Sequence, residues 1–240
     1  MVKLTLIQGD CLKALSSLND KSIDLIVTDP PFFMRLDSFK ISNKGKKGSE
    51  FKFFRKSFAD LSVFLPFFNN LFIEIERIMK PTGRIYIFCD GQTYPIFWYY
   101  LFPFTKIVRP LVWDKKTSLV GYTWRHQFEI IVYAEMPIAK PVPTGEGDII
   151  SYPAVKLSDR MHPAEKPVGL LEKIISKSSS ENDIVLDMFL GSGATMEACL
   201  RTERNCIGIE IEPAYIEICK KRLNWGSTLY NVQFEFKVIE

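Results

Sequence analysis

Short apolar runs alternate with longer amphipathic stretches from one end of the chain to the other. The short runs are rich in β-branched residues and have the length of strands, whereas the longer stretches repeat apolar residues at helical spacing. Such alternation is typical of βαβ units around a mostly parallel sheet. Strands are expected at Leu4 to Ile7, Ile23 to Thr28, Arg84 to Phe88, Ile107 to Trp113, Phe128 to Tyr133, Ile184 to Asp187 and Cys206 to Glu210.

Amphipathic helices are expected between these strands. Their ranges are Cys11 to Leu18, Leu61 to Met79, Pro95 to Leu101, Val168 to Ser176, Ala194 to Arg201 and Pro213 to Leu223. The tail from Asn231 to Ile239 alternates apolar and polar residues, which predicts one more strand at an edge of the sheet.

Two long segments fit neither pattern. Residues 33–58 contain Gly45, Gly48 and several phenylalanines, and a loop of this length in a compact domain is usually functional or mobile. Residues 136–161 are rich in proline and glycine and separate the two halves of the chain. An ordinary surface excursion is the alternative for both segments.

Composition narrows the class of protein. The length of 240 residues and the hydrophobic fraction of 47% predict one domain with a full core. The longest uncharged stretch, Gly91 to Thr105, is interrupted by two prolines and is shorter than the roughly 20 apolar residues of a bilayer span. No apolar run of signal-peptide length begins the chain, which favours a cytoplasmic location. Five cysteines without a Cys-x-x-Cys pair and only two histidines predict reduced thiols and no metal centre.

The net charge of +3 implies nothing about partners, but the distribution of charge along the chain indicates one. Between Arg35 and Lys56, eight basic residues stand against two acidic ones, an excess of six positive charges. Cationic side chains interleaved with aromatic rings suit a phosphate backbone and unstacked bases. This segment, 33–58, is therefore predicted to face a nucleic acid.

The motif Asp-Pro-Pro-Phe at residues 29–32 directly follows an apolar run. Prolines lack the backbone donor that a central strand needs, so the strand must stop at Asp29. At the carboxyl end of a parallel strand, this places a carboxylate, a rigid turn and an aromatic ring where open α/β sheets bind ligands. An ordinary strand-ending Asp-Pro turn is the alternative, and the aromatic residue after both prolines argues against it.

A second strand runs into Gly191, Ser192 and Gly193 and then into a helix. Glycines allow a tight turn and the close approach of a ligand, and the helix N-terminus supplies free amides. Met196 stands where the usual dinucleotide-binding fingerprint has its third glycine. The alternative hypothesis of a nicotinamide-dependent dehydrogenase is therefore supported only by the glycine turn and by an acid that follows it. That acid, Glu210, is placed to accept hydrogen bonds from ribose hydroxyls; a surface acid at a strand end is the alternative.

Five motifs in this order resemble the β-type, circularly permuted amino-methyltransferases of DNA, which use S-adenosylmethionine. The motifs are Gly-Asp-Cys at 9–11, Asp-Pro-Pro-Phe at 29–32, His-Pro-Ala-Glu-Lys-Pro at 162–167, the glycine loop at 187–195 and the segment 208–223. In that family, as here, the catalytic motif precedes the cofactor motif. The resemblance implies one Rossmann-like α/β methyltransferase domain over residues 1–240. Its sheet would be mostly parallel and seven-stranded, with one antiparallel strand and helices on both faces.

The resemblance also implies site residues. The catalytic residues would be Asp29, Pro30, Pro31 and Phe32: the Asp29 carboxylate and the Pro30 carbonyl each accept one hydrogen of the target amino group, while Phe32 stacks on a flipped-out base. The cofactor would contact Asp10, Cys11, Lys166, Asp187, Phe189, Gly191, Ser192, Gly193, Thr195 and Glu210. DNA would contact Arg35, Lys40, Lys44, Lys46, Lys47, Lys52, Arg55 and Lys56, with 136–161 as a short target-recognition insert.

Some roles stay open at this point. Lys166 is either a partner of the cofactor carboxylate or a solvated lysine ahead of a helix, and His162 is expected to orient its turn rather than act as an acid or base. The aromatic segment from Tyr94 to Phe104 is expected to be a core helix, with a homodimer interface as the alternative. A cognate restriction endonuclease acting on the same DNA site is a further partner compatible with the resemblance.

In having aspartate at position 29, the chain is similar to the adenine-modifying members of the family. Members that methylate the cytosine amino group usually carry serine at this position. The expected activity is therefore methylation of the adenine amino group at specific sites in duplex DNA. The alternatives are the same chemistry on cytosine and a catalytically silent DNA-binding subunit. Phe32 stands where most members have tyrosine, which keeps the stacking and removes a hydroxyl contact.

Overall fold

A computed structural model describes residues 1–31, 60–117, 124–139, 141–142, 145–156, 158–161, 164–227 and 232–239. Phe32, the basic segment 33–58 and His162 lie outside the described residues. The catalytic role of Phe32 and the DNA contacts expected of the basic residues therefore stay predictions.

The expected strands and helices are all present, most with ends within a few residues of those expected. The strands are β1 (Val2–Gln8), β2 (Ile23–Thr28), β3 (Met79–Cys89), β4 (Ile107–Asp114), β5 (Phe128–Glu135), β6 (Ile149–Ser151), β7 (Ile184–Asp187), β8 (Asn205–Glu210) and β9 (Val232–Val238). The helices are α1 (Cys11–Ser16), α3 (Leu61–Ile78), α4 (Tyr94–Leu101), the 3-10 turn η2 (Phe102–Phe104), α5 (Val168–Ser178), α6 (Ala194–Arg201) and α7 (Pro213–Arg222). None of the described helices is long and apolar enough to cross a membrane.

The strands form one sheet in the order β6-β4-β5-β3-β2-β7-β8-β1-β9. β5 runs antiparallel to both of its neighbours, β3 and β4, and the other pairings are parallel. The mostly parallel sheet with one antiparallel strand is therefore confirmed. The carboxyl ends of all strands except β5 lie along one edge of the sheet.

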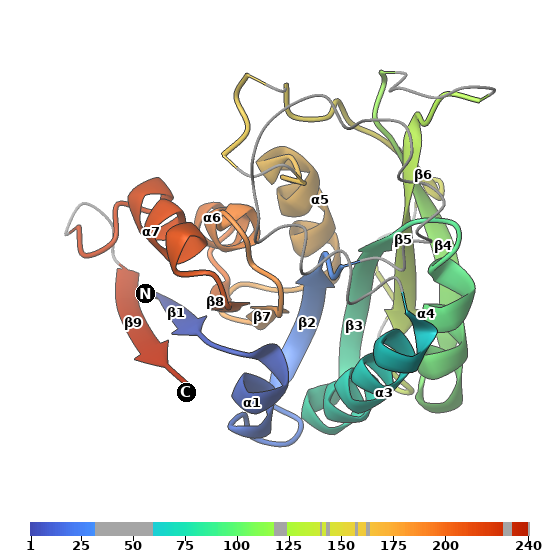
Figure 1. Cartoon of the computed structure of the whole chain (residues 1–240), viewed down its shortest axis with the longest axis horizontal. Helices are drawn as coiled ribbons and strands as arrows, with labels where there is room; N and C mark the ends of the chain where they lie inside the picture. The colour runs from blue at the N-terminus through green and yellow to red at the C-terminus, as the bar shows by residue number, and fades with distance from the viewer. Residues whose placement is uncertain are drawn as a thin grey trace.

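Helices cover both faces of the sheet (Figure 1). α1, α3 and α4 pack on one face, whereas α5, α6 and α7 pack on the other. Successive strand residues point to opposite faces, so in β3 Ile85 and Ile87 join the first layer and Tyr86 and Phe88 join the second. Burial on both faces is the reason that the central strands are nearly continuous apolar runs in the sequence.

The described sheet has nine strands, so the number of seven strands implied by the resemblance is wrong. β9, expected from the tail, pairs with β1 at one edge, and β6 pairs with β4 at the other. β6 lies within the insert 136–161 and is too short for alternation to reveal it. β3 begins at Met79 rather than Arg84, because Met79 pairs with Ile23 although the following proline and glycine are typical of a turn.

The aromatic segment around α4 divides between the core and the surface. Phe97 is fully buried, while Tyr99 and Phe102 are 70% and 60% exposed. The rings of Trp98 and Phe102 stack with their centroids 4.7 Å apart. The expected core helix is present, and it also carries an aromatic outer face.

Candidate active site

β2 and β7 are neighbours at the centre of the sheet, and the chain leaves them toward opposite faces. After β2 it reaches α3 on one face, and after β7 it reaches α6 on the other. Ligands of open α/β sheets bind at the carboxyl ends of strands where the strand order reverses in this way. The two motifs that the sequence singles out, one beginning at Asp29 and one at Asp187, therefore meet at this point.

β2 ends at Thr28, as the two following prolines require. The Asp29 side chain is partly buried, and its Oδ2 accepts a hydrogen bond from Lys166 Nζ at 2.5 Å. Its Oδ1 is buried and has no hydrogen-bond partner in the described part of the chain. A buried acceptor without a donor costs about 1–3 kcal/mol. The Oδ1 atom is thus an acceptor that a bound donor can satisfy.

Asp187 connects the ends of the two strands. Its carboxylate is 3% exposed, and its Oδ1 accepts hydrogen bonds from Thr28 Oγ1 at 2.8 Å and from the Phe189 amide at 3.1 Å. Burial raises the pKa of Asp187, and hydrogen bonds from Thr195 and Thr28 oppose the rise. Asp187 therefore holds β7 against β2 beside the predicted cofactor loop.

The glycine turn between β7 and α6 needs backbone conformations that favour glycine. Gly191 has a φ of 56°, and Gly193, the residue before α6, has a φ of 87°. A Cβ on Gly193 would lie 2.6 Å from the Sγ atom of Cys219 in α7. The second glycine is therefore required by packing against α7 as well as by the turn. Ser192 and Thr195 are buried in the same segment.

Glu210 ends β8 next to the glycine turn. Its Oε2 accepts from the Gly191 amide at 2.7 Å, and its Oε1 accepts from the Glu212 amide at 2.8 Å. Burial raises the pKa of Glu210, and the Asp187 charge adds to the rise, while these amides oppose it. Each carboxylate oxygen can accept a further hydrogen bond, so the contact with ribose hydroxyls stays a prediction.

Asp10 and Cys11 lie beside Glu210, because the Gly9 amide donates to the Glu210 carbonyl at 3.0 Å. Asp10 caps α1, with its Oδ1 accepting from the Leu12 amide at 2.9 Å and from the Lys13 amide at 3.1 Å. Cys11 is buried in the core, and burial raises the pKa of its thiol to about 12. Both residues have a structural role here, and their contact with adenine stays a prediction.

Lys166 lies beside Asp29 at the end of β2 rather than in water. Its Nζ contacts Asp29 Oδ2 at 2.5 Å and Glu129 Oε2 at 3.3 Å, and lies 5.0 Å from the centre of the Phe88 ring. Its side chain is only 8% exposed, so the alternative of a solvated lysine is wrong. Its predicted role at the cofactor carboxylate stays a prediction.

Two charged residues of this site were not expected from the sequence. Glu129, in β5, lies between Lys166 and Lys115, with its Oε1 2.5 Å from Lys115 Nζ. Lys115 follows β4 and is 8% exposed, with its ammonium group 5.1 Å from the centre of the Trp113 ring. The only sequence signal was a pair of charges at the ends of two apolar runs, which is typical of surface positions.

Asp29, Lys166 and Glu129 shift one another's pKa. Burial is the largest influence on Asp29 and raises its pKa, which Lys166 opposes and Glu129 supports. Burial also disfavours the charged form of Lys166, but Asp29 and Glu129 outweigh it and raise the pKa of Lys166. Burial likewise opposes ionisation of Glu129, yet the two lysines hold its pKa below the ordinary value. Glu129 and Lys166 are therefore charged at neutral pH.

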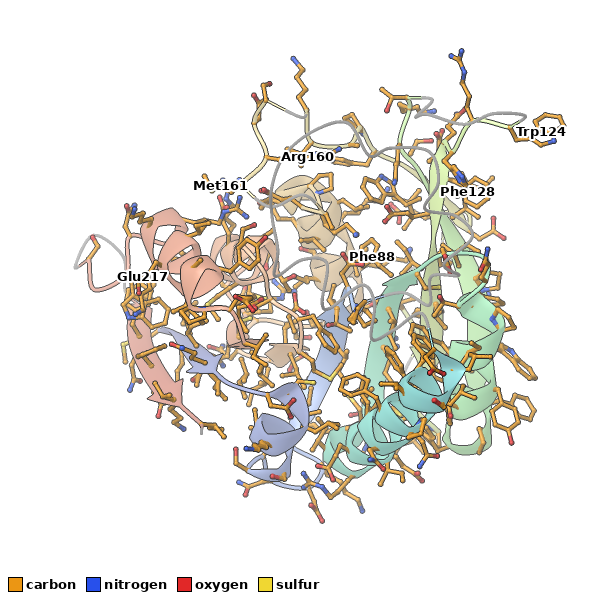
Figure 2. The ribbon with its side chains drawn as sticks, viewed as in Figure 1. Phe88, Trp124, Phe128, Arg160, Met161 and Glu217 are labelled. Atoms are coloured by element: carbon orange, nitrogen blue, oxygen red, sulfur yellow. The ribbon has the colours of Figure 1, made fainter. Side chains whose placement is uncertain are left out.

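The segment that carries Lys166 is anchored to α7 through its neighbour. The Glu165 carboxylate forms an ion pair with Arg222, and both side chains are at most 7% exposed. Glu165 Oε2 also accepts from the Met161 amide at 2.7 Å. Figure 2 shows Arg160 and Met161 on this segment, and Trp124 projecting from the connection between β4 and β5, at the same edge of the sheet.

Comparison with known proteins agrees with this geometry. The model of the N6/N4 DNA methylase family matches residues 23–221. The chain is 30% identical to the Type II methyltransferase M2.LlaDCHI of Lactococcus lactis subsp. cremoris, over 93% of this chain and 90% of that protein. It is 28% identical to the Type II methyltransferase M2.MboI of Moraxella bovis, over 96% and 91% of the two chains. The chain therefore belongs to the N6/N4 DNA methylase family and is a site-specific DNA methyltransferase.

Solved structures show the same fold. The complex of M1.HpyAVI with S-adenosylmethionine superposes with a TM-score of 0.67 at 28% identity, covering 92% of this chain and 99% of that one. The cytosine-N4-specific PvuII DNA methyltransferase superposes with a TM-score of 0.72 at 17% identity, covering 95% and 89%. The family uses S-adenosylmethionine, which confirms the predicted cofactor. The family match sets aside the dehydrogenase alternative.

Proposed function

We propose that the chain transfers a methyl group to the exocyclic amino group of an adenine flipped out of duplex DNA, as a β-type, circularly permuted member of its family. The observation that supports this most directly is the buried, unpartnered Oδ1 of Asp29 at the end of β2, within the described residues. An amino group offers two hydrogens, and Asp29 Oδ1 and the Pro30 carbonyl are the acceptors proposed for them. Aspartate at this position, rather than serine, is the feature that favours adenine over cytosine.

Holding the amino group is the main task of these residues. The lone pair of an exocyclic amino nitrogen is delocalised into the base, and two acceptors on its hydrogens direct that lone pair away from the ring. Positioning of this kind, together with stabilisation of the positive charge that develops on nitrogen, can supply much of the rate. The Asp29 carboxylate need not be a strong base, because the nitrogen releases a proton readily once it is positively charged.

The residues at the glycine turn fit S-adenosylmethionine by their charge. Asp187 and Glu210 are buried acids whose pKa burial raises, and a positively charged ligand would favour their ionised forms. The turn from Gly191 to Thr195 and Glu210 are proposed to hold the cofactor, with Asp10 and Cys11 beside its adenine. The cofactor supplies an electrophilic methyl group on a sulfonium.

The flipped base is proposed to stack on Phe32. Extrusion costs a few kcal/mol, and stacking on an aromatic ring contributes about 1–3 kcal/mol per base. These magnitudes are similar, so the pocket can hold its base without base pairing. The basic segment 33–58 and the insert 136–161 are proposed to contact the flanking duplex, with phosphate contacts that give affinity and little specificity.

The identity of the methylated base tests this proposal. DNA from cells that express the chain and lack other methyltransferases is digested to nucleosides and also sequenced with direct detection of modified bases. We expect N6-methyladenine within one recognition sequence. Only N4-methylcytosine would move the substrate to cytosine, and unmodified DNA would instead support a silent DNA-binding subunit.

The proposed partners follow from the same observations. The relatives M2.LlaDCHI and M2.MboI are Type II methyltransferases, which supports a cognate restriction endonuclease that acts on the same DNA site. The exposed rings of Tyr99 and Phe102 on the outer face of α4 support a homodimer.

A further inference from the structure

Glu129 is a partly buried acid that the proposed reaction does not use. Its Oε1 is 2.5 Å from Lys115 Nζ and its Oε2 is 3.3 Å from Lys166 Nζ. The Oε2 atom is buried and makes no hydrogen bond that satisfies normal geometry within the described residues. A buried charge destabilises the fold by several kcal/mol unless it is well paired. An acid in this position therefore calls for a functional explanation.

The four groups form one alternating row of charges: Lys115, Glu129, Lys166 and Asp29. They come from four parts of the chain, namely the end of β4, the start of β5, the segment before α5 and the end of β2. Both ammonium groups lie over aromatic rings, with Lys115 Nζ 5.1 Å from the Trp113 ring centre and Lys166 Nζ 5.0 Å from that of Phe88. The rings restrict where each ammonium group can lie, so the spacing of the row is constrained.

We propose that Glu129, itself held by Lys115, is a positioning residue that keeps Lys166 on Oδ2 of Asp29 and leaves Oδ1 for the target amino group. The inference rests on the proposed function of Asp29 and adds two residues to it. The two carboxylates share one ammonium group. Without Glu129, Lys166 can move toward both oxygens of Asp29 and cover the acceptor that the substrate needs.

Under this proposal, loss of the Lys115 charge and loss of the Glu129 charge change the ionisation of Asp29 in opposite directions. Removing the Glu129 charge takes away a repulsion and leaves Lys166 wholly to Asp29, so the carboxylate ionises more easily. Removing the Lys115 charge strengthens the pull of Glu129 on Lys166, so Asp29 ionises less easily. A residue that only supported the fold would not shift the ionisation of Asp29 in this way, and a charge that acted only through space would shift it without lowering the plateau rate.

Other groups that face Asp29 do not change this sign. Asp187, at the end of β7, adds to the rise in the pKa of Asp29, and it is the same in every variant. Cys89, at the end of β3, has a thiol whose pKa is raised by burial and by the acids Asp90, Asp29 and Glu129, so it stays neutral. The row of four charges is thus the part that the variants alter.

The test is the pH profile of single-turnover methyl transfer to DNA from cells that lack the protein. In Glu129→Gln we expect the acid limb of the profile to move to lower pH and the plateau rate to fall on the order of 10- to 100-fold through misplacement of the acceptor. In Lys115→Met we expect the acid limb to move to higher pH. Glu129→Asp keeps the charge and should leave the limb near its original pH.

Glu135→Gln is the matched control. Glu135 lies at the other end of β5, where its Oε1 accepts from the Tyr133 hydroxyl at 2.5 Å, and its loss should leave the acid limb in place. An unmoved limb in Glu129→Gln, or shifts of the same sign in Glu129→Gln and Lys115→Met, would overturn the proposal. If Glu129→Gln does not fold, the test rests on Lys115→Met alone. An acid limb that stays in place or moves to lower pH in Lys115→Met would then overturn the proposal. Failure of the proposed function can be distinguished from failure of this inference, because in the first case Asp29→Ala would retain methyl transfer.

Discussion

Asp29 differs from Asp187 and Glu210 in what its two oxygens contact. Asp187 and Glu210 accept hydrogen bonds from Thr28 and from backbone amides, which hold strand ends and turns together. Asp29 has one oxygen on Lys166 and one without a partner in the described chain. A carboxylate that supports the fold has no need of a free acceptor. This difference from Asp187 and Glu210, together with the position of Asp29 directly after β2, supports Asp29 as the acid proposed to contact substrate.

Replacing Asp29 by alanine removes that acceptor without altering the glycine turn. We expect Asp29→Ala to lower the rate of methyl transfer by about 100-fold or more, the effect of losing one preorganised group in a water-excluded site. Binding of S-adenosylmethionine, measured by isothermal titration, should change little. The matched control is Asp20→Ala, an exposed acid paired with Arg77. Equal loss of cofactor binding and methyl transfer in Asp29→Ala would mean that Asp29 is structural.

The glycine turn and α7 form one packed unit at the scale of elements. Gly193 lies against Cys219 of α7, and the Glu165–Arg222 ion pair attaches the segment carrying Lys166 to the same helix. α7 therefore positions both the predicted cofactor loop and the lysine beside Asp29. This packing explains in structural terms why the segment 208–223 occurs together with the other motifs of the site.

Gly193→Ala should destabilise this unit in two ways. The left-handed backbone costs about 1–2 kcal/mol for an alanine, and the clash with Cys219 adds about 1–3 kcal/mol, both measurable by urea unfolding. Gly226→Ala is the control, because Gly226 has a φ of 82° and no described atom lies within 4 Å of the place that its Cβ would take. Equal losses in the two variants would show that Gly193 has no packing role.

Charge is unevenly distributed over the whole molecule. The segment 33–58 carries an excess of six positive charges in a chain of net charge +3, so the remainder is net acidic. The described site is itself acidic, with Asp29, Asp187 and Glu210 near one another. We therefore expect affinity for the phosphate backbone to come mainly from the basic segment and to depend on salt.

Neutralising Lys44, Lys46 and Lys47 to glutamine should weaken binding to duplex DNA and flatten its dependence on salt. Each lost phosphate contact lowers the slope of log affinity against log salt by about 1, so the slope should fall by up to about 3. The control replaces Lys3, Lys21 and Lys106, which are exposed at the amino ends of β1, β2 and β4. A slope that does not change, measured by fluorescence anisotropy, would assign the basic segment to another role.

Most of the fold could be predicted from the sequence, because the signals are local. β2 and β7 are apolar runs that end at prolines or glycines, and the chemistry of those residues marks the strand ends without any tertiary information. The same property located both motifs of the site. β6 could not be predicted, because three residues carry no period, and it exists only through its pairing with β4.

The sequence by itself determined the order of the strands and helices other than β6, the two motifs at strand ends and the family of the protein, since each depends on neighbouring residues. Only the tertiary structure decided which charges meet. Lys166 and Asp29 are 137 residues apart and Lys115 and Glu129 are 14 apart, and no local pattern relates them. These ion pairs form because the sheet brings the carboxyl ends of β2 and β4 and the start of β5 to one edge, where burial makes each charge require a partner.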